Sequence, residues 1–97
     1  MAEIRVTISE LKAKAETLRE YNTQFKGQID GLKTEEETVC SMWEGEAKTK
    51  FDNQFKENYE KFVKFYELVN TYCEGMIQIA NKYSEAEDYN VSIAGTQ

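Results

Sequence analysis

The chain has 97 residues and a net charge of −6, which limits it to one small acidic domain. Its Lys and Arg residues form no basic block, so nucleic acids and anionic membrane surfaces are disfavoured as partners. No His is present, which removes the usual general base and the usual zinc ligand. Because proline is also absent and helix-forming residues are abundant, the composition predicts a few long helices.

The N-terminal residues, MAEIRVTISE, contain neither the apolar region of a signal peptide nor a cleavage site. No apolar run in the sequence approaches the ~18 residues that a membrane-spanning helix needs. We therefore expect a protein that is synthesised in the cytoplasm, has no cleaved signal peptide and does not insert stably into membranes.

A first helix is predicted over about residues 7–40. Thr7 and Glu10 form a capping-box pattern at its start, and Val6 and Leu11 are placed as a hydrophobic staple. Apolar residues at 3-4 spacing then predict one buried stripe, with a seven-residue repeat at Leu11, Leu18, Phe25, Leu32 and Val39. The intervening positions are apolar with two polar interruptions: Ile4, Ile8, Ala15 and Ile29, with Asn22 and Glu36.

The helical pattern stops at residues 41–45, where the chain places its single tryptophan, Trp43, and then Gly45. Gly45 supplies the backbone freedom that a turn or a helix start needs. Ser41 with Glu44 could cap the following helix, which allows its first residue to shift by two or three positions. Trp43 is interpreted as a plug that folds back over the helix ends, or as an exposed residue that a partner recognises. The two roles can coexist.

A second helix is predicted over about residues 46–87, followed by a flexible tail at residues 88–97. The seven-residue repeat continues in this helix with Phe55, Phe62, Val69, Met76 and Tyr83. Further apolar residues, Phe51 among them, widen its apolar face well beyond one stripe. Its other face carries acid-before-base pairs at i,i+4 that are typical of a solvated helix: Glu46/Lys50, Asp52/Lys56, Glu57/Lys61 and Glu60/Lys64.

These elements predict an all-α fold, an antiparallel helix-turn-helix hairpin, because a connection of about five residues returns the second helix along the first. Cys40 then lies at the turn and Cys73 far along the second helix, so free, partly buried thiols are expected. A hairpin buries one seam and leaves the wide apolar face of the second helix in water, which marks an interface.

We therefore expect two chains to pair about a two-fold axis into an elongated four-helix bundle. The residues expected to pack in its core and dimer interface are Leu11, Leu18, Phe25, Leu32, Phe51, Phe55, Phe62, Val69 and Met76.

A Trp-x-Gly tripeptide at the centre of a two-helix chain of about a hundred residues resembles the WXG family. The early-secreted-antigen-like members of that family are substrates of bacterial type VII secretion systems. The segment WEGEAKTKF, residues 43–51, also resembles the longer motif of Firmicute members, in which Ala47 and Phe51 follow the tripeptide.

The second element of the family, a C-terminal Tyr-x-x-x-Asp/Glu, is matched by YSEAE, Tyr83 to Glu87. The alternative is that Tyr83 is the last packing residue of the repeat and Glu87 a solvated charge. The resemblance implies an antiparallel dimer in which Trp43 and Gly45 of one chain join Tyr83 and Glu87 of the other. Together these residues would form a composite export signal.

The resemblance further implies export by the membrane ATPase of a type VII system to the extracellular space or the cell surface. There the protein would act as a secreted dimeric, virulence-associated binding factor without catalytic activity or cofactor. Two alternatives stay open: a co-export partner that forms a heterodimer with a larger effector, and an intracellular helical adaptor.

An enzyme is disfavoured, because neighbouring acids at 35–37 and 85–88 diverge around a helix axis. A metal site is not expected, since two Cys without His need further ligands.

Overall fold

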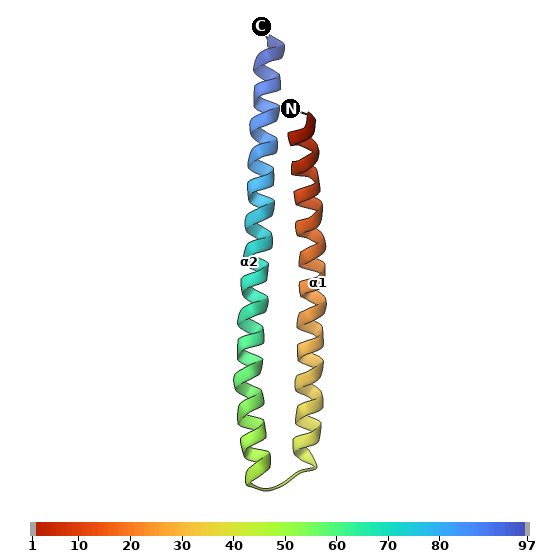
Figure 1. Ribbon diagram of the computed structural model, residues 1–97, viewed down its shortest axis with the longest axis vertical. Helices are drawn as coiled ribbons and strands as arrows, with labels where there is room; N and C mark the ends of the chain where they lie inside the picture. The colour runs from red at the N-terminus through yellow and green to blue at the C-terminus, as the bar shows by residue number, and fades with distance from the viewer. Residues whose placement is uncertain (1, 97) are drawn as a thin grey trace. The chain divides into compact units, whose positions relative to one another are not determined.

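The computed structural model contains two helices and describes the backbone of residues 2–96 and the side chains of residues 7–86. Helix α1 spans Ala2–Ser41 and helix α2 spans Glu46–Thr96 (Figure 1). No strand occurs between residues 2 and 96, and within that range neither helix has a segment long and apolar enough to cross a membrane. The predicted all-α helix-turn-helix fold is confirmed.

Both helices extend further than the sequence pattern indicated. Because α1 begins at Ala2, Thr7 lies inside the helix and does not act as its N-cap. α2 begins at Glu46, as expected, but continues to Thr96, past the predicted end near residue 87. Without proline in either segment, each added residue gains a backbone hydrogen bond at no new nucleation cost, and this favours extension.

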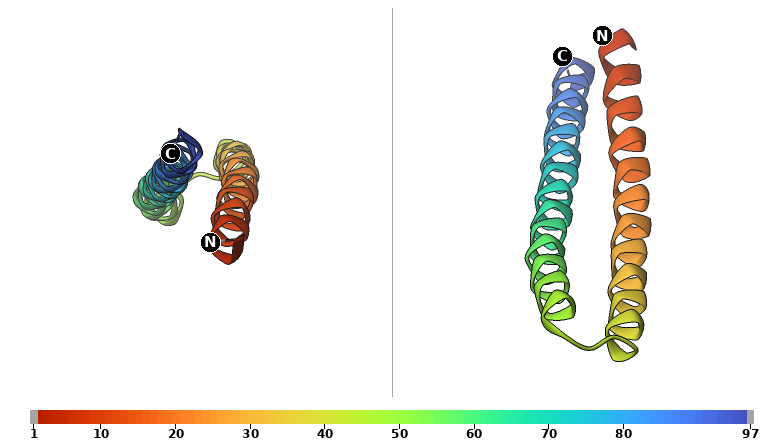
Figure 2. Two further views of the ribbon diagram at one scale, coloured as in Figure 1. Left: turned by 90° about the horizontal axis from the view of Figure 1, so that it is seen from above. Right: turned by 60° about the horizontal axis from the view of Figure 1, so that its bottom comes forward.

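The chain divides into two compact units, each of which holds a segment of both helices. The turn unit comprises Tyr21–Val69, and the terminal unit comprises Met1–Glu20 with Asn70–Gln97. Within the turn unit, residues 42–45 reverse the chain, so that the end of α1 and the start of α2 run antiparallel (Figures 1 and 2).

A seam of mostly small or polar side chains lies between the helices of each unit. In the terminal unit the buried residues are Ala15, Cys73 and Ala80. In the turn unit they are Asn22, Ile29, Glu36 and Cys40. Most of these residues belong to one seven-residue line on each helix, positions 8, 15, 22, 29 and 36 of α1 and positions 52, 59, 66, 73 and 80 of α2. The largest apolar side chains therefore lie beside the seam rather than in it.

Gly45 is the residue at which the chain enters α2, and its φ of 118° is one that L-residues rarely adopt. Its carbonyl accepts the backbone N–H of Thr49 at 3.3 Å, so Gly45 occupies the N-cap position. A Cβ at this position would meet nothing within 4 Å, so only the backbone conformation opposes a side chain there. We expect Gly45→Ala to lower the free energy of unfolding by about 1–3 kcal/mol.

Gly27→Ala is the matched control for this prediction, because a Cβ at residue 27 also meets open space but the backbone is ordinary helix. It should raise the free energy of unfolding by roughly 0.5–1 kcal/mol, since Ala favours a helix interior. Urea unfolding followed by far-UV circular dichroism measures both changes. Equal effects of the two substitutions would show that the positive φ at Gly45 carries no energetic weight.

Candidate functional site at the turn and on the exposed apolar face

The turn closes the end of α1 with hydrogen bonds to the last carbonyl groups of the helix. Backbone N–H groups of Met42 and Trp43 donate to the carbonyls of Val39 and Cys40, at 3.1 and 3.4 Å. Ser41 is the last residue of α1, and its hydroxyl donates to the carbonyl of Thr38 at 2.6 Å. Ser41 therefore serves the end of the first helix, whereas the sequence suggested a cap for the second.

Trp43 is both packed and exposed. Its ring lies 5.8 Å from the ring of Phe51, centroid to centroid, with the two planes at 51°. The reversal at Gly45 brings Trp43 back over the first turns of α2, which explains the spacing between the two aromatic residues. Trp43 nevertheless keeps 38% of its surface exposed, and Phe51 keeps 45%. The pair thus covers the start of α2 and also presents aromatic surface to a partner.

The turn unit carries an exposed aromatic and aliphatic face. Phe25 of α1 contacts Phe62 and Phe65 of α2 edge-to-face, with ring centroids 6.2 and 5.9 Å apart. Phe62 and Phe65 are 42% and 55% exposed, and Leu32 is 55% exposed. Contiguous apolar surface of this kind is uncommon on a protein that stays alone in water.

The terminal unit repeats this feature. A shallow groove on it is lined by Leu18, Thr71, Tyr72, Gly75, Met76 and Ile79. A second hollow further along α2 is lined by Ile79, Lys82, Tyr83 and Ala86. Tyr83, the first residue of the predicted C-terminal motif, is 59% exposed. The side chain of Glu87, the last residue of that motif, lies outside the described residues.

None of the nine residues predicted to pack in the core and dimer interface is fully buried in the single chain. Five are half-buried: Leu11, Phe25, Phe55, Val69 and Met76. Four are exposed: Leu18, Leu32, Phe51 and Phe62. Of the fully buried positions on α1, Ala15 and Ile29 were expected in the buried stripe, whereas Asn22 and Glu36 read as polar interruptions, although the same seven-residue spacing joins all four.

Polar contacts across the seam of the turn unit fix how the two helices are aligned. The Asn22 side chain donates from Nδ2 to the backbone carbonyl of Tyr66 at 2.9 Å. The Tyr59 hydroxyl donates to Asp30 Oδ1 at 2.7 Å, and Lys26 Nζ pairs with the same carboxylate at 2.8 Å. The bonds from Lys26 and Tyr59 lower the pKa of Asp30 below its usual value, and the bond to Asp30 raises the pKa of Tyr59. A sliding of one helix along the other would break the Asn22–Tyr66 and Tyr59–Asp30 bonds, which cross between the helices.

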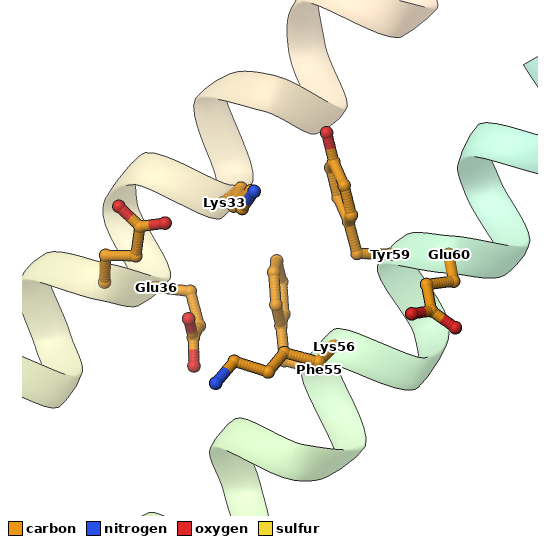
Figure 3. Close-up of a pocket in the computed structure, with 7 residues that line it drawn as sticks. Lys33, Glu36, Phe55, Lys56, Tyr59 and Glu60 are labelled. Atoms are coloured by element: carbon orange, nitrogen blue, oxygen red, sulfur yellow. The ribbon is translucent and has the colours of Figure 1, made fainter.

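A groove of mixed charge lies beside this network, lined by Lys33, Glu36, Glu37, Phe55, Lys56, Tyr59 and Glu60. Lys33 Nζ lies 4.8 Å from the centre of the Tyr59 ring, a cation–π contact between the helices. Glu36 of α1 and Lys56 of α2 point toward one another across the groove (Figure 3).

Comparison with known proteins places these features in a wider group. Residues 3–88 match the family WXG100, described as proteins of 100 residues with WXG. The chain is similar to Protein YukE of Bacillus subtilis strain 168, with 29% identity over 89 residues, 92% of this chain and 91% of the relative. It is also similar to Type VII secretion system extracellular protein A of Staphylococcus aureus strain USA300, with 24% identity over 87 residues, 90% of each chain. No solved structure was found to match.

Proposed function

Because the chain belongs to the WXG100 family, we propose that it is a substrate of a bacterial type VII secretion system, exported without a cleaved signal peptide. The observation that carries this proposal is the turn itself, where Trp43 packs on Phe51 behind Gly45 and stays partly exposed. The name of the Staphylococcus aureus relative, an extracellular protein of such a system, supports the same function.

We infer that two chains pair through the exposed apolar faces of the turn unit and the terminal unit. The exposure of Leu32, Phe62 and Phe65 in one unit and of Tyr72 and Ile79 in the other supports this pairing. Burial of such surfaces against a second copy would yield an elongated four-helix bundle with two-fold symmetry. A related helical protein or an effector could occupy the same face, which would make a heterodimer.

The export signal that we propose is composite. Trp43 and Gly45 of one chain would lie near Tyr83 and Glu87 of its antiparallel partner, and the membrane ATPase of the secretion system would recognise them together. Tyr83 is 59% exposed in the single chain, so its side chain is accessible to a recognising protein. Since each chain holds half of the signal, dimerisation would be required for export. The exported dimer would then act as a virulence-associated binding factor.

Substitution of either half of the signal is expected to stop export. In the native host, Trp43→Ala and Tyr83→Ala should each reduce the protein in the culture medium at least about tenfold, while the protein in the cells persists. An immunoblot of cells and medium, with a cytoplasmic marker to exclude lysis, measures the distribution. Tyr21→Ala is the matched control, because Tyr21 is a similarly exposed tyrosine, at 63%, outside both motifs.

Each variant must first be shown to dimerise by light scattering, so that a loss of export is not a loss of pairing. If the wild type appears in the medium and the dimeric variants do so equally, the composite signal is wrong and export uses another surface. If the wild type itself stays in the cell, the chain is better described as an intracellular adaptor.

A further inference from the structure

A cluster of three ligand-bearing side chains lies near the turn, between the last turns of α1 and the second turn of α2. Glu36 and Cys40 come from α1 and Asp52 from α2, and one ligand atom of each lies within 4.8 Å of the others. Cys40 Sγ donates to Glu36 Oε1 at 3.0 Å. We propose that Glu36, Cys40 and Asp52 bind a divalent cation, and that zinc is the metal which suits them best.

The spacing of the donor atoms is close to that of a tetrahedral zinc site. Zn–S bonds of about 2.3 Å and Zn–O bonds of about 2.0–2.2 Å place neighbouring ligand atoms roughly 3.5 Å apart. The Sγ–Oε1 separation of 3.0 Å and the 4.8 Å limit for the whole cluster bracket that value. Small rotamer changes would therefore bring the three donors to one ion, and a water would complete the tetrahedron. A thiolate ligand favours zinc over the hard cations magnesium and calcium.

Burial directs the donors inward. Glu36 is 6% exposed and Cys40 is 9% exposed, so both are held by the seam and lose little conformational freedom on binding. The described hydrogen-bond partners of the Glu36 carboxyl group are members of the cluster, the Cys40 thiol and the Asp52 side chain. This buried carboxyl group is thus directed into the cluster, and the Lys56 ammonium group is its charged neighbour on the solvent side.

A positively charged side chain, Lys56, already lies beside the cluster on its solvent side. Lys56 Nζ pairs with Asp52 Oδ2 at 2.8 Å and points toward Glu36 (Figure 3). The Lys56 side chain is 68% exposed, so it can turn into water when a metal ion arrives. The ion would then be surrounded by two carboxylates and a thiolate. A divalent cation compensates their negative charge better than a single ammonium group does.

The thiol would change its protonation state on binding. In the metal-free protein the Cys40 thiol donates its proton to Glu36 Oε1 at 3.0 Å and so keeps its S–H bond. On binding, the S–H bond breaks, an S–Zn bond forms, and the proton goes to water. The sequence did not suggest a metal site because only Cys and His were considered as ligands; folding adds Glu36 and Asp52 to the set.

Cobalt(II) is the probe that tests the site, because a thiolate bound to cobalt gives a charge-transfer absorption that carboxylates alone do not. We expect the reduced full-length protein to develop this absorption with one cobalt per chain and to lose it when zinc is added. Cys40→Ser should abolish the band. Glu36→Gln and Asp52→Asn should each raise the Kd for cobalt at least about tenfold.

Two matched controls separate this cluster from the other thiol and from acidic charge in general. Cys73→Ala removes the second cysteine, and Glu37→Gln removes an exposed carboxyl group next to Glu36; both should bind cobalt as the wild type does. Far-UV circular dichroism checks that each variant is helical, and if Cys40→Ser does not fold, the more exposed Asp52→Asn decides. The absence of the band in the wild type, or its loss in Cys73→Ala alone, would overturn the proposal.

Discussion

Phe65→Glu is expected to convert the proposed dimer into monomers while leaving the helices intact. Phe65 is 55% exposed in the single chain. The substitution removes its ring contact with Phe25 but little other buried surface from the hairpin. In a symmetric dimer, however, it would place a carboxylate from each chain in an apolar interface. We expect the dimer Kd to rise at least about a hundredfold, which corresponds to ~2.7 kcal/mol. Sedimentation equilibrium measures this change.

Asn53→Glu is the matched control for the pairing experiment, because it adds the same charge at an exposed polar position of the same helix. It should leave the Kd within about threefold of the wild type. A Phe65→Glu protein that dimerises as tightly as the Asn53→Glu protein would place the interface elsewhere. Loss of helicity in Phe65→Glu would instead show that Phe65 supports the hairpin of the single chain.

Ile29→Ala is expected to lower the free energy of unfolding by about 2–4 kcal/mol, the largest effect of a single truncation that we predict for the hairpin. Ile29 is 4% exposed and is the largest aliphatic side chain among the fully buried residues. Its truncation removes apolar contacts and leaves a cavity that rigid helices fill only in part. Urea unfolding by circular dichroism, at a protein concentration low enough for monomers, measures the loss.

Leu32→Ala provides the comparison that distinguishes the seam from the exposed face. Leu32 is 55% exposed, so its truncation should cost less than about 1 kcal/mol in the monomer. At higher concentration the cost should grow, because binding of a second chain adds to the apparent stability of the folded state. If Leu32→Ala destabilises the monomer as much as Ile29→Ala, the seam lies along the line of Leu32.

The sequence was sufficient to predict both helices and the turn between them, while the first residue of α2 was open by two or three positions. Periodic apolar residues and the absence of proline define the helices, and Gly45 is the residue whose backbone freedom the reversal uses. The contact between Trp43 and Phe51 could not be derived in the same way, because it depends on how far the chain turns back within four residues. α2 extends past its predicted end because residues 88–96 mix polar and apolar side chains without a periodic signal.

Which stripe forms the seam was also not evident from the sequence. Large apolar residues dominate any periodicity, so Leu18, Leu32 and Phe62 marked a line that the folded chain leaves exposed. The residues actually buried include Asn22 and Glu36, which read as interruptions until their partners on α2, the Tyr66 carbonyl and the Asp52 side chain, are known. A side-chain amide is buried between helices only where it can form a hydrogen bond. The acceptor for Asn22 is the backbone carbonyl of Tyr66, which is distant in sequence.

The backbone conformation at Gly45 restricts the chirality of the residue that can occupy this position. Open space surrounds the position, so bulk does not decide what it accepts. What decides is handedness. A φ of 118° is the mirror image of −118°, a value that L-residues adopt freely, so a D-amino acid favours it. Glycine holds this position because it is the one achiral residue that the ribosome supplies, and a chemically made chain with D-alanine at 45 would fit as well.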